Sequence, residues 1–137
     1  VYTLKIIYVY IILMVNSYSE FTGNRKDYLN LLKMNEGLMI IKFSADWCKP
    51  CKAIKDHVIC KYAEMPEKTM CIEIDIDNSL DIFAYLKNKK MVPGIPTIFC
   101  YKKGNESFAP DEFVSGSDLK EIDYFFNNCK ELYQELE

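Results

Sequence analysis

The chain of 137 residues is 50% apolar and 27% charged, the balance of an ordinary globular protein with room for one hydrophobic core. A formal net charge of −3 argues against a nucleic-acid partner. The 6 cysteines are too few and too irregularly spaced for a disulfide-rich scaffold, so we expect one monomeric domain that folds without such cross-links.

An apolar N-terminal extension, residues 1–17, precedes the predicted domain at residues 18–137. Three interpretations of it stay open. If translation starts at Met14, the residues before it are extraneous and the protein is cytoplasmic, which is the interpretation that we adopt. The apolar run 6–15 followed by Ser17 also has the pattern of a signal peptide for the secretory pathway. As a membrane anchor the run is short, because ~15 helical residues reach roughly 22 Å and the hydrocarbon core is about 30 Å thick.

The first half of the domain has the pattern strand, helix, strand. Residues 17–21 predict a short strand, and Asn24 is a suitable N-cap for a helix that ends near Gly37. The apolar run Leu38–Phe43 predicts a buried strand, which leads directly to a pair of cysteines.

Cys48 and Cys51 lie at the junction between this strand and a predicted helix that continues to about residue 63. Their spacing lets the two sulfurs form a disulfide across one helical turn. Because the free N–H groups and the dipole at a helix N-terminus favour a thiolate, Cys48 is the predicted nucleophile and Cys51 the resolving cysteine. Pro50 falls in the first turn, where a proline loses no hydrogen bond.

Half of a zinc site is the competing interpretation of two cysteines at this spacing. Zinc normally needs a second Cys pair or a Cys and His pair, but His57 is the only histidine and no second Cys-x-x-Cys motif occurs. We therefore expect redox chemistry and no metal, with His57 a surface residue. The other cysteines are expected to be buried structural thiols: Cys60, Cys71, Cys100 and Cys129.

The second half of the chain continues the alternation. Residues 70–77 alternate apolar and polar side chains as a strand does, and Asn78 or Ser79 can cap a helix that runs to about residue 89. The remaining predicted elements are strands at 97–102 and 112–115 and a last helix capped by Ser117. This order predicts an α/β fold with a central mixed sheet and helices on both faces.

Three segments resemble the thioredoxin family. Residues 43–52, Phe-Ser-Ala-Asp-Trp-Cys-Lys-Pro-Cys-Lys, resemble its active-site segment, and residues 94–97, Gly-Ile-Pro-Thr, resemble the loop whose proline follows a cis peptide bond. Lys103-Gly104, followed by Val-Ser-Gly at 114–116, resembles the last hairpin of that fold. The resemblance covers most of the chain.

The resemblance implies the thioredoxin fold, with a mixed sheet of about four or five strands between helices. It also implies a thiol–disulfide oxidoreductase that reduces or exchanges protein disulfides through a Cys48–Cys51 dithiol–disulfide cycle. No cofactor is implied, because reducing equivalents would come from a partner similar to thioredoxin reductase. The alternative function is that of a thioredoxin-fold adaptor or chaperone subunit without redox chemistry, against which the intact cysteine pair argues.

The same resemblance implies a substrate groove beside the cysteines. Trp47 matches the tryptophan that covers the disulfide in the family. Pro96 would follow a cis bond, so that the Ile95 backbone pairs with an extended substrate segment. The predicted groove is completed by Gly94, Ser115 and Gly116.

Two departures from the family pattern concern charge. Lys49 stands where glycine is common, and a cation beside the Cys48 thiolate should make the cysteine pair more oxidising. Lys42 stands where a buried carboxylate usually assists the second cysteine, and Glu73 stands across the sheet where some members carry lysine. We therefore expect a buried ion pair of reversed sign and a slower resolving step.

Overall fold

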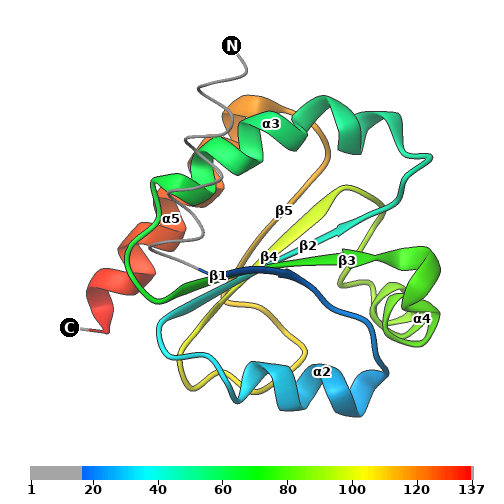
Figure 1. The fold of residues 1–137 in the computed structure, drawn as a ribbon, viewed down its shortest axis with the longest axis horizontal. Helices are drawn as coiled ribbons and strands as arrows, with labels where there is room; N and C mark the ends of the chain where they lie inside the picture. Colours follow the sequence, from blue (N-terminus) through cyan, green and yellow to red (C-terminus); the bar gives the residue numbers. More distant parts are fainter. Residues whose placement is uncertain (1–16, 137) are drawn as a thin grey trace.

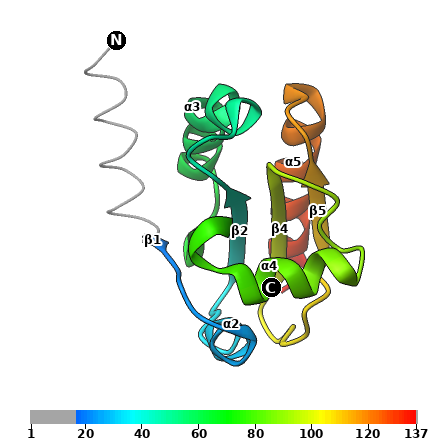
Figure 2. The same cartoon turned by 90° about the vertical axis from the view of Figure 1, so that its right-hand side faces the viewer.

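The computed structural model describes residues 17–136, which form an open five-stranded sheet with helices on both faces (Figures 1 and 2). The strands are β1 (Ser17–Glu20), β2 (Leu38–Ser44), β3 (Thr69–Asp75), β4 (Thr97–Lys102) and β5 (Glu112–Ser115). The helices are α2 (Arg25–Leu32), α3 (Lys49–Ala63), α4 (Leu80–Asn88) and α5 (Leu119–Glu135), with a short 3-10 helix, η1 (Ile76–Asn78). The predicted α/β architecture with a mixed central sheet is confirmed.

β2 lies in the centre of the sheet, whose strand order is β1-β3-β2-β4-β5. β1, β3 and β2 are parallel to one another, whereas β4 and β5 are each antiparallel to the strand before them in this order. The carboxyl ends of β2 and β3 therefore meet at the same edge of the sheet.

Both faces of β2 are buried, because a pair of helices covers each face of the sheet. Met39 and Ile41 belong to the core beneath α2 and α4, and Leu38 and Ile40 belong to the core beneath α3 and α5. All residues of Leu38–Phe43 are buried, including the lysine among them. A strand that is covered on both sides has no solvent face, which explains its nearly continuous apolar sequence.

Several boundaries differ from the sequence prediction, and the largest difference is the end of α2, which lies at Leu32 and not near Gly37. α5 is capped by Asp118 rather than by Ser117, because the Asp118 carboxylate accepts hydrogen bonds from two N–H groups of the first turn. β3 ends at Asp75, two residues before the predicted end, because the Asp75 side chain accepts from the Asp77 N–H and turns the chain into η1. Ser79 occupies the N-cap position of α4 as predicted, but its side chain makes no capping hydrogen bond.

A cluster of charged side chains joins α3 to α5. Asp123 Oδ1 lies 2.6 Å from His57 Nε2 and 3.4 Å from Lys61 Nζ. The hydrogen bond with His57 is the main cause that lowers the pKa of Asp123, and the charge of Lys61 acts in the same direction. His57 therefore contributes to the packing of one helix on the other.

We predict that Asp123→Asn destabilises the protein near pH 7 by less than about 1 kcal/mol, because the Asp123 side chain is 42% exposed and solvent screens such pairs. A carboxyl group whose pKa is lowered on folding stabilises the folded state above its unfolded pKa, about 3.9, and this stabilisation is lost as pH falls through the folded pKa. Urea unfolding should therefore show a deficit near pH 7 that is smaller at pH 3. An equal deficit at both pH values would mean that the carboxylate acts through packing alone.

Candidate active site

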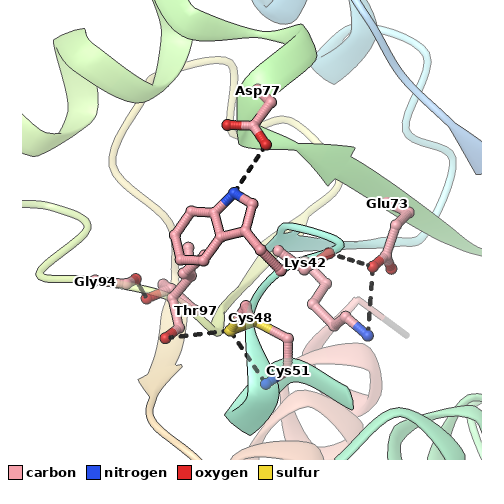
Figure 3. The surroundings of a disulfide bond; sticks show 10 residues. Lys42, Cys48, Cys51, Glu73, Asp77, Gly94 and Thr97 are labelled. Carbon is pink, nitrogen blue, oxygen red and sulfur yellow. Dashed lines mark hydrogen bonds and ion pairs between the residues drawn. A yellow bond between two sulfur atoms is a disulfide. The ribbon is translucent and has the colours of Figure 1, made fainter.

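The end of β2 leads into a short turn that places Cys48 at the N-cap of α3. The backbone N–H of Cys51 donates to Cys48 Sγ at 3.2 Å, and the two cysteines are joined in a disulfide (Figure 3). Each cysteine is only 4% exposed. Pro50 lies in the first turn of the helix, as predicted. The structure thus assembles the two predicted cysteines at a helix N-terminus.

The helix N-terminus distinguishes the two sulfurs chemically. When the disulfide is reduced, the N–H of Cys51 is in position to stabilise a thiolate on Cys48 Sγ. The effect of the helix dipole falls off within the first turn, so the same stabilisation is weaker at Cys51. The arrangement favours Cys48 as the nucleophile in thiol–disulfide exchange.

The loop that precedes β4 lies against Cys48. The Ile95–Pro96 peptide bond is cis, as predicted, and the Ile95 carbonyl oxygen lies 4.0 Å from Cys48 Sγ. Thr97 Oγ1 donates to the Gly94 carbonyl oxygen at 2.6 Å and fixes the loop on itself (Figure 3). The backbone of Ile95 is therefore next to the sulfur that would receive a substrate disulfide.

The turn after β5 lies on the other side of the same loop. The Gly116 N–H donates to the Pro96 carbonyl oxygen at 2.9 Å, and Ser115 Oγ lies 2.7 Å from Thr97 Oγ1. Gly116 has a φ of +98°, which glycine adopts without a side-chain clash. The structure thus brings together the predicted groove residues: Gly94, Ile95, Pro96, Ser115 and Gly116.

Trp47 lies at the surface beside the disulfide and is 63% exposed, so it is not a core aromatic residue. Its indole Nε1–H donates to Asp77 Oδ2 at 2.9 Å (Figure 3). Asp77 is a residue of the site that no local sequence pattern identifies. The available signal was topological: Trp47 follows β2 and Asp77 follows β3, and parallel neighbours end at the same edge of a sheet.

Lys42 and Glu73 form the buried ion pair of reversed sign that the sequence predicts. They are direct neighbours on β2 and β3, and Lys42 Nζ lies 3.4 Å from Glu73 Oε1. Ser44 Oγ donates to the same carboxylate oxygen at 2.7 Å (Figure 3). The side chains are 4% and 18% exposed, respectively, so the pair lies largely out of contact with water.

A cavity of about 200 Å³ joins this ion pair to the redox site. Lys42, Glu73 and Cys51 all line it. Within residues 17–136, the second carboxylate oxygen, Glu73 Oε2, is buried and has no hydrogen-bond partner. A carboxylate oxygen with an unused lone pair, in a cavity shared with a cysteine, is chemically suited to accept a proton.

The other cysteines lie in the core or at its margin, and none of them is in a disulfide: Cys71, Cys100 and Cys129 are buried, and Cys60 is half-buried. Burial raises the pKa of the Cys71 thiol. A hydrogen bond with Cys129, together with burial, raises the pKa of the Cys100 thiol. Thiols that stay protonated are poor nucleophiles, which agrees with the predicted structural role of Cys71 and Cys100. The prediction that Cys60 is buried is wrong, because Cys60 is only half-buried.

Within residues 17–136, no group of three or more histidine, cysteine or acidic side chains is arranged to hold a metal ion. In the same part of the chain, no helix combines the length and apolar character needed to cross a bilayer. The predicted extension, residues 1–17, lies outside the described residues except for its last residue, so its boundary stays a prediction.

We predict that breaking the buried ion pair is strongly destabilising. Lys42→Gln or Glu73→Gln should each lower the free energy of unfolding by about 3 kcal/mol, because the remaining charge stays buried without its partner. The double variant Lys42→Glu/Glu73→Lys should recover more than half of that loss, since opposite charges again meet in register. Urea unfolding of all three variants measures this. A double variant no more stable than the single variants would show that hydrogen-bond geometry, and not charge pairing, governs the site.

The part of the chain that holds this site resembles known proteins. The family model for thioredoxin matches residues 19–128, which include both cysteines and the cis-proline loop. Thioredoxin of Gallus gallus is 38% identical over 88 residues, which cover 61% of this chain and 76% of that protein. The solved structure of oxidised mitochondrial thioredoxin 3 from Saccharomyces cerevisiae has a TM-score of 0.64 and 25% identity, over 81% of this chain and 94% of that chain. The Trichomonas vaginalis thioredoxin structure has a TM-score of 0.63 and 24% identity, over 81% and 96%, respectively.

Proposed function

This chain belongs to the thioredoxin family and is a thiol–disulfide oxidoreductase of that fold, and on this premise we propose that Cys48 is its attacking cysteine and Cys51 its resolving cysteine. One observation supports this division above all. Cys48 Sγ is the N-cap atom of α3 and accepts the backbone N–H of Cys51 at 3.2 Å.

The first step forms a mixed disulfide with the substrate. The Cys48 thiolate attacks one sulfur of a protein disulfide, so that a bond forms between Cys48 Sγ and that sulfur. The bond between the two substrate sulfurs breaks, and the leaving sulfur takes its electron pair and is then protonated. Trp47, held by Asp77, borders the site where this exchange occurs.

The second step releases the substrate. Cys51 Sγ attacks Cys48 Sγ, the Cys48–Cys51 bond forms, and the second substrate sulfur leaves with its electron pair. The substrate is reduced to a dithiol and the enzyme returns to the disulfide drawn in Figure 3. Cys51 must first lose its proton, and we assign Glu73 as the acceptor because it lines the cavity beside Cys51 and has an unpartnered carboxylate oxygen.

The cis-proline loop positions the substrate. An extended segment of the partner pairs with the backbone of Ile95, in the manner of a strand added to a sheet. The Ile95 carbonyl oxygen is 4.0 Å from Cys48 Sγ, so a cysteine in that segment is delivered to the attacking sulfur. Ser115 and Gly116 form the opposite rim of this groove.

Reducing equivalents come from a second protein. We propose a reductase similar to thioredoxin reductase as the electron donor, because the regeneration of the dithiol requires two electrons and no bound cofactor is implied by the family. We further propose that the protein acts as a monomer without a nucleic-acid partner, in line with its net charge of −3.

The four free cysteines favour a reducing compartment. Cys60, Cys71, Cys100 and Cys129 are unpaired in the structure, and unpaired thiols persist best where glutathione and related systems keep them reduced. We therefore propose a cytoplasmic location. The mass of the mature protein from its own cell tests this, because removal of the first 17 residues would indicate the secretory pathway.

We predict that the protein reduces insulin in the presence of dithiothreitol. Substitution of Cys48 and substitution of Cys51 should affect this reaction in different ways. Cys48→Ser should abolish the activity, since the nucleophile is lost. Cys51→Ser, first reduced and then freed of dithiothreitol, should still attack but should accumulate a mixed disulfide between Cys48 and the substrate, which non-reducing electrophoresis detects. Trapping through Cys51 in the Cys48→Ser variant would reverse the assigned roles. A wild-type protein that forms its disulfide but reduces nothing would favour the adaptor function.

We predict that Lys49→Gly makes the cysteine pair more reducing by about 10 to 20 mV, because one neighbouring cation contributes up to ~1 kcal/mol to a thiolate and 30 mV corresponds to about 1.4 kcal/mol. Equilibration of both proteins against glutathione buffers measures the two potentials. A variant with the same potential as the wild type would show that Lys49 is too well solvated to act on Cys48.

A further inference from the structure

The charged residues of α3 from Lys49 to Lys55 are all lysines, and Asp56 follows them directly. Lys49, Lys52 and Lys55 are all exposed and recur at every third residue, and no acidic residue lies in the first turn. Residues at this spacing lie on one side of a helix. A row of cations therefore begins between the two redox cysteines and continues along α3. We call Lys49, Lys52 and Lys55 the lysine row.

The lysine row is unfavourable for the helix itself. The N-terminus of a helix carries partial positive charge, so cations there reduce helix stability and acidic residues are preferred. No ion pair compensates the row, since none of its three members pairs with a carboxylate in residues 17–136. Unpaired cations at a helix N-terminus, beside a reactive disulfide, are not explained by the stability of the fold and therefore indicate a role in function.

The position of the lysine row relates it to the redox reaction. Lys49 lies directly between the two cysteines in sequence, and Lys52 and Lys55 line the same cavity as Cys51. Two carboxylates of that cavity each have one oxygen with a partner: Glu73 Oε1 binds Lys42 and Ser44, and Asp75 Oδ1 accepts a backbone N–H. Asp46 and Glu20 also line it and are exposed, whereas Lys52 and Lys55 line it from α3.

The geometry points to a substrate class: we propose that the lysine row binds carboxylates, and that the preferred substrates are disulfides in acidic polypeptide segments. This inference rests on the proposed oxidoreductase function and adds specificity to it. The chain as a whole has a net charge of −3 and would repel an acidic partner at long range. A local row of cations beside Cys48 overcomes this repulsion where the exchange occurs and orients the partner with its acidic side toward α3.

Two peptide disulfides test the proposal. Both carry the same intramolecular disulfide, with glutamates on either side of the cysteines in one and glutamines at the same positions in the other. At low ionic strength, the wild-type protein should reduce the glutamate peptide with a kcat/KM about tenfold higher than the glutamine peptide, as expected for electrostatic steering. The ratio should approach one in ~0.5 M salt, because screening removes long-range attraction.

Variants separate the lysine row from overall charge. Lys49→Gln/Lys52→Gln/Lys55→Gln should bring the ratio close to one, and its thermal stability should not fall, because cations are removed from a helix N-terminus. The matched control is Lys33→Gln/Lys68→Gln/Lys103→Gln, which changes the net charge equally. Its exposed lysines lie toward the opposite end of β2, since the Lys103 N–H donates to the Gly37 carbonyl oxygen and Lys68 also adjoins Gly37. The control should keep the wild-type ratio.

Each outcome is decisive. A wild-type ratio near one, or an equal loss in both triple variants, overturns the lysine row as a recognition site. Because a change in redox potential alters the reduction of both peptides together, only the ratio between them reports recognition. Failure of the wild-type protein to reduce either peptide would instead overturn the proposed function.

Discussion

The burial of β2 on both faces is the constraint on which the rest of the structure depends. Helices on each side of the sheet hold Leu38–Phe43 out of solvent, so the register of this strand with β3 and β4 is fixed. A fixed strand end fixes the turn that follows it, and hence the N-cap position of Cys48. The same register places Lys42 opposite Glu73. The reactive sulfur and the charged cavity behind it are therefore set by one strand.

The buried ion pair shows how a charged site can keep its geometry while its sign is reversed. Two side chains that meet in register need only carry opposite charges to avoid an isolated buried ion. The chemistry is not symmetrical, because an ammonium group donates protons and hydrogen bonds while a carboxylate accepts them. The carboxylate, Glu73, lies on β3, whereas the family resemblance implies a carboxylate on β2 at the position of Lys42. Both strands end at the same edge of the sheet, and Cys51 and Glu73 line the same cavity.

Much of the fold was predictable because local patterns and global packing agree. Asn24 Oδ1 accepts the Asp27 N–H at the start of α2, and the Asp27 carboxylate accepts the Asn24 N–H in return. The apolar runs of β2 and β4 became strands. Asp118 and Ser117 are both good N-caps, and only the backbone geometry decided between them. The cis bond at Pro96 came from the family resemblance, since tertiary context decides the isomer. The bond between Trp47 and Asp77 joins residues 30 apart in sequence, which local patterns do not reveal.

The small exposure of the two redox sulfurs restricts what a partner must look like. With Cys48 and Cys51 each 4% exposed, a disulfide that lies flush with the surface of a rigid, folded partner is poorly placed to reach Cys48. The partner must bring its own sulfur down to Cys48, on a protruding loop, a frayed terminus or a chain that is locally unfolded. The low exposure of Cys48 should therefore favour disulfides on mobile segments over stable, well-packed cystines.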